Sequence, residues 1–220
     1  MNMPSINVAI TDDHLLILSS LVQHVNSFEN CKVIMQANDG AELLEQLESA
    51  AAVPDVCILD INMPILNGYK TLLEMKRLYP DIRVIVLTAF VTDFAIIRMI
   101  QNGASAYLPK NCRSEELREA IHTLATSKYF YSDMVPKRMF DRAKTELLPE
   151  FTTRELEFLR WCCRQLRYNE IAKKMYVSER TVENYFNSIS RKVHIKDRGS
   201  LIAFAKDSGL VYTTHDSEIM

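Results

Sequence analysis

The stretch VCILDINMPILNG, residues 56–68, runs four apolar residues into an aspartate and then breaks into a turn. An apolar run of this length that ends at a turn is typical of a buried β-strand. The aspartate at its end, Asp60, is costly to bury in its ionised form unless other charges meet it. For a lone aspartate, capping of the next turn would be explanation enough, so the question is which charges lie near Asp60.

Short apolar runs of the same kind recur through the first 125 residues. The stretches between them have apolar residues spaced by three and four, which is typical of helices. Strands that alternate with helices predict a parallel sheet covered on both faces. We expect strands over residues 6–10, 31–35, 56–59, 84–87 and 106–108, and a fifth helix from Ser114. Residues 1–128 are therefore predicted to form a flavodoxin-like, doubly wound α/β domain with strand order 2-1-3-4-5.

Length and composition indicate a soluble chain of two domains. The 220 residues are 48% hydrophobic and 25% charged, and no apolar run approaches the roughly 20 residues that a membrane helix needs. The five cysteines include no CxxC pair, so neither a disulfide framework nor a zinc site is indicated. We expect a cytoplasmic protein with no membrane partner.

Charge is distributed unevenly along the chain. Residues 1–125 carry 9 Lys and Arg against 15 Asp and Glu, whereas residues 151–212 carry 12 against 7. An acidic half joined to a basic half suggests two functions, and the basic half points to a polyanionic partner such as double-stranded DNA.

Three carboxylates should meet at one edge of the predicted sheet. Strands 1 and 3 are neighbours in this topology, and ligands bind beyond their carboxyl ends. Asp12 and Asp13 follow strand 1, and Asp60 follows strand 3. Like charges this close raise one another's pKa unless a cation joins them, and oxygen ligands suit Mg²⁺.

Two further side chains should reach the same edge. Thr88 ends strand 4 and Lys110 follows strand 5. Each would be unremarkable alone, as a strand terminus or a solvated charge, but together with the three acids they form a site that accepts a phosphoryl group. Asp60 would be the nucleophile, Thr88 would bond a phosphoryl oxygen, and Lys110 with Mg²⁺ would balance the charge.

Residues 5–125 resemble the receiver domain of bacterial two-component response regulators. The resemblance rests on DD after the first strand, on DINMPILNG, on Thr88 followed by the small Ala89, and on Lys110. It implies that a cognate histidine kinase phosphorylates Asp60. It also implies that Asp13, Asp60 and the main-chain carbonyl of Asn62 bind Mg²⁺, with Asp12 nearby through water.

The resemblance also assigns roles to residues around the phosphoryl group. Tyr107 matches an aromatic position whose rotamer couples to Thr88, although a packed strand aromatic is an equally simple reading. Phe90 would shield the phosphoaspartate from water and slow its hydrolysis. Asn111 departs from the proline that many receivers have after the lysine. We expect His14 to begin the first helix rather than to bind metal.

The pattern changes between the two halves. Residues 129–149 are predicted to be a linker that can hold a short helix, because Pro136 and Pro149 flank a charged, mixed stretch. Residues 150–214 then show helical patterns without a strand, and Thr152 with Glu155 forms a capping-box signature. We expect an all-α four-helix domain with helices over about 153–165, 168–176, 179–192 and 197–207.

The second and third of these helices are separated by two residues, which predicts a helix-turn-helix. A helix with Asn, Thr and Arg on its outer side can enter the major groove of DNA, although a solvated helix face is the simpler alternative. The basic charge of this half favours DNA. The outer side of the third helix carries Arg180, Thr181, Glu183, Asn184, Asn187, Arg191 and Lys192.

Residues 151–212 resemble the LuxR-type DNA-binding domain of NarL/FixJ regulators. The matching runs are FTTRELEFLRWCC, NEIAKKMYVSERTVENYFNSISRKV and DRGSLIAFAKDSGLV. The resemblance implies a homodimer on DNA, formed through the last helix. Gln165 and Glu183 depart from a usual glycine and a frequent lysine. The resemblance also implies that Glu183, Asn184 and Asn187 face the bases and that Asn169, Thr181 and Lys192 contact phosphates.

The sequence thus predicts a response regulator that accepts a phosphoryl group and controls transcription, and not an enzyme acting on other substrates. Two alternatives stay open. One is a Mg²⁺-dependent hydrolase with an Asp nucleophile, and the other is a DNA-binding protein whose first domain no longer accepts phosphate and serves only to dimerise.

Overall fold

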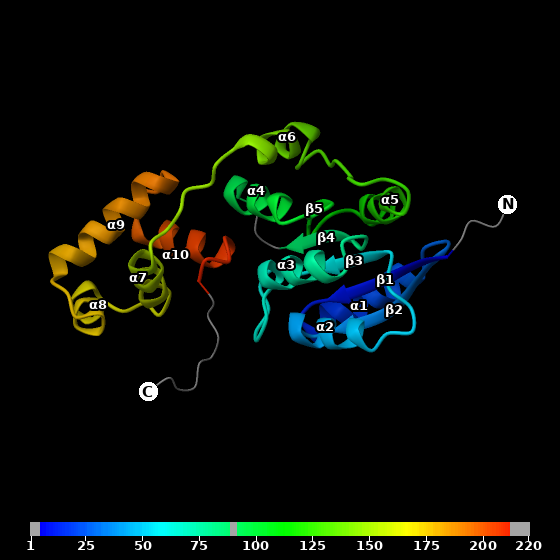
Figure 1. Ribbon diagram of the computed structural model, residues 1–220, viewed down its shortest axis with the longest axis horizontal. Helices are drawn as coiled ribbons and strands as arrows, with labels where there is room; N and C mark the ends of the chain where they lie inside the picture. Colours follow the sequence, from blue (N-terminus) through cyan, green and yellow to red (C-terminus); the bar gives the residue numbers. More distant parts are fainter. Residues whose placement is uncertain (1–4, 89–91, 212–220) are drawn as a thin grey trace. The chain divides into compact units, whose positions relative to one another are not determined.

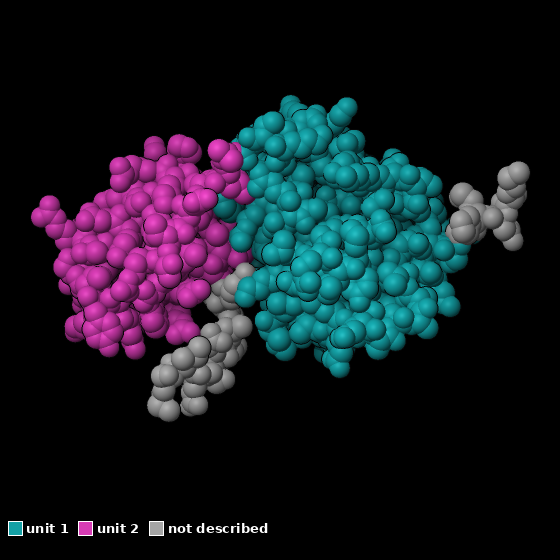
Figure 2. Space-filling model, in the orientation of Figure 1, with its two compact units in different colours: residues 1–146 teal, residues 147–220 magenta. Residues whose placement is uncertain are grey.

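The computed structural model describes residues 5–88 and 92–211; Ala89 and Phe90, both singled out above, lie outside the described residues. The chain forms two compact units, residues 1–146 and 147–220, which Figure 2 colours separately. In the described parts of both units, no helix has the length and apolar character needed to span a bilayer.

The first unit is built on a five-stranded parallel sheet whose order is β2-β1-β3-β4-β5, which confirms the predicted topology (Figure 1). Each predicted strand is present and up to two residues longer than expected. The strands are β1 (Ile6–Thr11), β2 (Cys31–Ala37), β3 (Val56–Leu59), β4 (Arg83–Thr88) and β5 (Ala106–Pro109). The helices are α1 (Leu15–Asn26), α2 (Gly40–Glu48), α3 (Gly68–Leu78), α4 (Asp93–Gln101), α5 (Ser114–Leu124) and α6 (Lys137–Thr145).

Apolar side chains cover both faces of this sheet. One core cluster joins α1 and α5 to strand residues such as Val8, Ile58 and Ile85. The alternate strand positions, including Cys57 and Val84, are equally buried. Because successive strand residues point to opposite faces, the buried sides of α2, α3 and α4 must cover the second face. A sheet covered in this way leaves only its strand ends accessible for chemistry.

The linker is shorter than predicted, because helix α6 belongs to the first unit. Residues 129–146, most of the segment expected to link the domains, belong to the first unit. Helix α6 packs on α4 and buries Phe140, which is 2% exposed. The Nε2 atom of Gln101, at the end of α4, donates to the carbonyl oxygens of Ala143 and Glu146 at 3.0 and 2.8 Å. These contacts bind the segment to the sheet domain, so the chain passes between units only after Glu146.

The second unit consists of four helices, as predicted: α7 (Thr153–Cys163), α8 (Tyr168–Met175), α9 (Glu179–Val193) and α10 (Arg198–Asp207). The predicted capping box is present, because Thr152 and Glu155 exchange hydrogen bonds at the start of α7. The side chains of Phe158, Ile171, Val182 and Leu201, one from each helix, are fully buried. They form the core that fixes α8 and α9 as a helix-turn-helix.

Candidate functional site

The parallel pairing of β1 and β3 brings the predicted carboxylates to one edge of the sheet. Thr11 and Leu59 are partners in the sheet register, and each is followed directly by an aspartate. The amide of Asp60 donates to the carbonyl oxygen of Thr11 at 3.0 Å. The side chains of Asp12 and Asp60 are both almost fully buried.

Lys110 connects the two buried acids. Its Nζ atom lies 2.6 Å from Oδ2 of Asp12 and 3.1 Å from Oδ2 of Asp60. The lysine is held in place through its main chain, since its amide donates to the carbonyl oxygen of Thr88 at 2.8 Å. The ammonium group supplies the opposite charge that makes burial of these carboxylates tolerable.

The electrostatics of the cluster follow from burial and from this lysine. Burial raises the pKa of Asp60 to about 6, with a further increase from the charge of Asp12, while Lys110 opposes the rise. Burial alone would lower the pKa of Lys110, but hydrogen bonds and charge from Asp12 and Asp60 raise it. Asp60 is therefore ionised at neutral pH but unfavourably so, and an added cation would stabilise it.

The residues present fit a hard divalent cation. Ligand atoms of Asp12, Asp13, His14 and Asp60 lie within 4.8 Å of one another. The Oδ1 atom of Asp13 is buried and lies beside these ligand atoms, with Nδ1 of His14 as a close neighbour at 2.8 Å. Carboxylate oxygens suit Mg²⁺, and the half-buried Asn62 lies two residues beyond Asp60.

His14 is closer to the acids than its predicted role suggests. It stands at the N-cap of α1, as expected, but its Nδ1 atom lies 2.8 Å from Oδ1 of Asp13 and 3.2 Å from Oδ1 of Asp12. Its amide also donates to Asp12 at 2.9 Å. A nitrogen ligand suits Mg²⁺ poorly, so we assign His14 to orienting the acid pair.

Gly68, the last residue of the quoted stretch, is required by a close approach of two main chains. A Cβ atom at this position would lie 2.2 Å from the carbonyl oxygen of Asp60 and 2.8 Å from the Cα of Ile61. The Gly68 amide donates to the carbonyl oxygen of Ile61 at 2.9 Å. The glycine thus lets α3 begin directly against the end of β3 and fixes the backbone that carries Asp60.

Thr88 and Tyr107 lie on the neighbouring strands β4 and β5, and both are 1% exposed. Tyr107 is paired in register with Val86, two residues before Thr88. The buried position is consistent with tight packing of the ring, and a rotamer change coupled to Thr88 stays a prediction.

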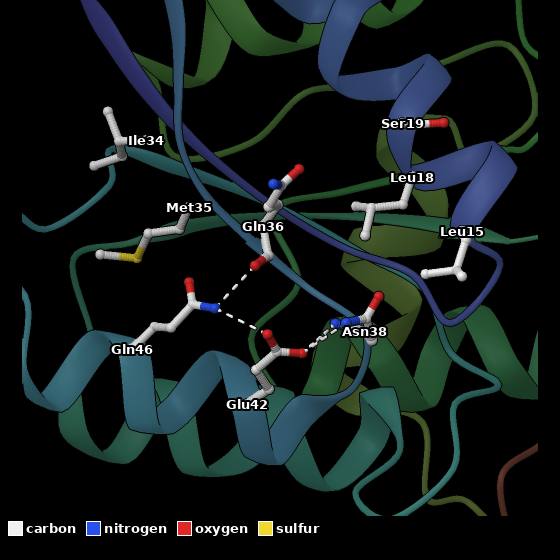
Figure 3. Close-up of a pocket in the computed structure, with 9 residues that line it drawn as sticks. All are labelled: Leu15, Leu18, Ser19, Ile34, Met35, Gln36, Asn38, Glu42 and Gln46. Atoms are coloured by element: carbon white, nitrogen blue, oxygen red, sulfur yellow. Dashed lines mark hydrogen bonds between the residues drawn. The ribbon is translucent and has the colours of Figure 1, made fainter.

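A separate hollow of about 530 Å³ lies between α1, β2 and α2 (Figure 3). Gln46 crosses it, and its Nε2 atom donates to the carbonyl oxygen of Gln36 at 2.9 Å. None of the three aspartates lines this hollow. The acid cluster is therefore a different site from this hollow.

In the second unit, α9 presents most of the predicted outer residues to solvent. Its N-terminus is capped by Ser178, whose Oγ atom accepts from the amide of Thr181 at 3.1 Å. Asn169, expected to contact phosphate, is exposed on the first turn of α8. The exposed outer residues of α9 are Arg180, Glu183, Asn184, Asn187 and Arg191, and Thr181 is half-buried.

Lys192 occupies a different environment from the one predicted. Its Nζ atom lies 2.7 Å from Oε2 of Glu155 and 2.8 Å from the carbonyl oxygen of Glu150. Glu155 also accepts from Ser188 at 2.7 Å. The ammonium group is thus engaged inside the unit, where Lys192 joins α9 to α7, and its contact with a phosphate stays a prediction. Nothing in the local sequence marks this pair; only the capping role of Glu155 was visible.

Both units match known protein families. The model of the response regulator receiver domain matches residues 8–122, and that of bacterial regulatory proteins of the luxR family matches residues 149–205. An uncharacterized transcriptional regulatory protein of Bacillus subtilis, YxjL, is 31% identical over 219 residues, covering 96% of this chain and 100% of its own. The response regulator VraR of Staphylococcus epidermidis is 23% identical, with 94% and 99% covered.

The fold is also found among solved structures. RcsB from Salmonella enterica serovar Typhimurium, in a promoter-bound form, superposes with a TM-score of 0.67 at 23% identity, covering 92% of this chain and 98% of that one. The response regulator ChrA of a haem-sensing two-component system superposes with a TM-score of 0.53 at 24% identity, covering 94% of this chain and 100% of that one. With the acid cluster, the helix-turn-helix and both family matches in place, the chain belongs to the NarL/FixJ response regulators, which join a receiver domain to a LuxR-type domain.

Proposed function

We propose that a histidine kinase transfers a phosphoryl group to Asp60 and that this modification controls sequence-specific DNA binding by the second unit. The observation that carries the proposal is the position of Lys110, within 3.1 Å of both Asp12 and Asp60. A buried acid of raised pKa beside a fixed cation is the arrangement expected of a phosphoryl acceptor.

The transfer follows from the positions of the protein groups. An ionised Oδ atom of Asp60 attacks the phosphorus in line with the phosphohistidine nitrogen, so that an O–P bond forms as the N–P bond breaks. The leaving imidazole nitrogen keeps the electron pair of the broken bond. Lys110 stabilises negative charge on the phosphoryl oxygens, and the hydroxyl of Thr88 donates to one of them.

Mg²⁺ would be held by Asp13, Asp60 and the main-chain carbonyl of Asn62, with Asp12 nearby through water. Bound there, it would neutralise charge on the phosphoryl oxygens as they approach the carboxylates. The grouping of carboxylate oxygens from Asp12, Asp13 and Asp60 within 4.8 Å of one another supports this assignment.

For the second unit we propose a helix-turn-helix that places α9 in the major groove of double-stranded DNA. The support is a surface helix whose outer side carries Arg and Asn side chains, in a basic unit that matches the luxR family. RcsB is bound to DNA as dimers in one solved structure, which supports a homodimer on DNA here, with α10 as the contact. We place the protein in the cytoplasm, where a kinase and DNA are both accessible, and assign it no catalysis beyond its own phosphorylation and dephosphorylation.

The alternatives make different predictions when the full-length protein is incubated with acetyl phosphate and Mg²⁺. A response regulator gives a stable phosphorylated band in phosphate-affinity electrophoresis, and Asp60→Asn gives none. A hydrolase instead releases phosphate continuously without an accumulating band. A receiver that no longer accepts phosphate gives neither, and either of these results would contradict the proposal.

A further inference from the structure

The geometry of α9 separates an inner side from a side available to a ligand. Val182 and Ile189 are fully buried and lie seven residues apart, which is about two turns of helix. On the side of α9 opposite to these two residues, four residues spaced by four, three and four positions form a single stripe. Glu183 lies beside the centre of this stripe. The stripe consists of Arg180, Asn184, Asn187 and Arg191.

The middle of this surface carries no cation. Asn184 and Asn187 are exposed amides, and the exposed carboxylate of Glu183 makes no ion pair in the part of the chain that the structure describes. Arg180 stands one turn before Glu183 without pairing with it. Arg191, one turn after Asn187, donates through Nε to the carbonyl oxygen of Asn187 at 3.2 Å. The central base-reading groups are therefore two amides and one acid.

An acid on a surface that approaches DNA is unfavourable in general, because it repels the phosphates and releases no counterion. In the major groove, a carboxylate can offset this repulsion by accepting a hydrogen bond from the amino group N4 of cytosine. Asn pairs through two hydrogen bonds with N6 and N7 of adenine, whereas guanine is read by Arg or Lys. The side chains at the centre of α9 thus favour cytosine and adenine and offer no donor pair for guanine.

We propose that Glu183 is a specificity-determining residue that selects cytosine at one position of each half-site, beside adenines read by Asn184 and Asn187. The inference rests on the proposed DNA-binding function and defines the base chemistry that this surface recognises. The neighbouring positions of the three residues on the helix place their contacts on adjacent base pairs.

The test is a quantitative binding selection from random double-stranded DNA with the full-length protein and two variants at position 183. Wild type should enrich a motif with cytosine next to adenines. Glu183→Lys should change that one base to guanine, because lysine donates to O6 and N7, and should leave the adenines unchanged. Glu183→Ala should reduce the preference for cytosine roughly tenfold while raising affinity for unrelated DNA.

Glu179→Lys is the matched control, because Glu179 is also exposed on α9, one turn earlier, and undergoes the same change of charge. It should raise affinity for all DNA without changing any preferred base. Fluorescence of Trp161, the only tryptophan of the chain, verifies that each variant is folded. If Glu183→Lys behaves like Glu179→Lys, or if the wild-type motif lacks cytosine, the proposed role of Glu183 is wrong. The proposed DNA-binding function would still stand in that case. If wild type enriches no sequence, the proposed function itself fails and this inference with it.

Discussion

The Nζ atom of Lys192 lies 2.7 Å from Oε2 of Glu155, and the pair joins α9 to α7 across 37 residues of sequence. The glutamate side chain is 4% exposed and the lysine side chain 29% exposed. Removal of the lysine would leave a buried carboxylate without its cation. We therefore assign Lys192 a role in the stability of the second unit.

Lys192→Met should destabilise the second unit by about 2 kcal/mol, since it removes hydrogen bonds to a charged group while keeping the length of the side chain. Urea unfolding followed by the fluorescence of Trp161, which lies on α7, measures this directly. The control is Lys196→Met, at an exposed position just beyond α9, which should leave the transition unchanged. Equal transitions for both variants would show that the ion pair contributes nothing.

The same pair predicts acid sensitivity of the second unit. Burial alone would raise the pKa of Glu155, but bonds from Lys192, Thr152 and Ser188 lower it from 4.5 to about 2. A depressed pKa stabilises the folded state above pH 4.5, and this contribution is lost as pH falls toward 2. The stability difference between wild type and Glu155→Gln, followed by Trp161 fluorescence, should shrink over this range. A difference that is constant with pH would contradict the assigned role of Glu155.

Asp60→Asn should stabilise the first unit at neutral pH in the presence of EDTA. Burial raises the pKa of Asp60 from 3.8 to about 6, so the ionised carboxylate destabilises the folded state above pH 6. The gain should shrink as pH falls from 6 toward 3.8, because Asp60 then becomes protonated in the folded state. Calorimetric melting of the two proteins at pH 7 and pH 4 measures the gain. Lower stability of Asp60→Asn at pH 7 would show that its ion pair with Lys110 outweighs burial.

Gln101→Ala should loosen α6 while the sheet stays intact. Its amide donates to two carbonyl oxygens at the end of α6, and their loss leaves that helix end unsatisfied. Hydrogen exchange of residues 137–146 should become faster. Gln46→Ala is the matched control, because it removes a similar bond to the carbonyl oxygen of Gln36 far from α6. Unchanged exchange in α6 would mean that packing of Phe140 alone holds the helix.

The sequence allowed the sheet and the acid cluster to be predicted because both follow from local patterns. Apolar runs identify parallel strands, and the carboxyl ends of neighbouring strands share an edge, so Asp12 and Asp60 had to meet. The attachment of α6 was missed because its three buried residues lie in a charged stretch and meet their partners, among them α4 and the rings of Tyr129 and Tyr131, only in the folded unit. The pairing of Lys192 was missed because side chains 37 residues apart leave no mark in local spacing.

Control of DNA binding by phosphorylation of Asp60 is tested by measuring the DNA affinity of the full-length protein with and without acetyl phosphate and Mg²⁺. The DNA is the sequence enriched by wild type, and Asp60→Asn is measured in parallel at the same salt concentration. We expect the phosphodonor to change the affinity of wild type for this DNA and to leave the affinity of Asp60→Asn unaffected. Equal affinities of wild type with and without the donor, at full phosphorylation of Asp60, would contradict it.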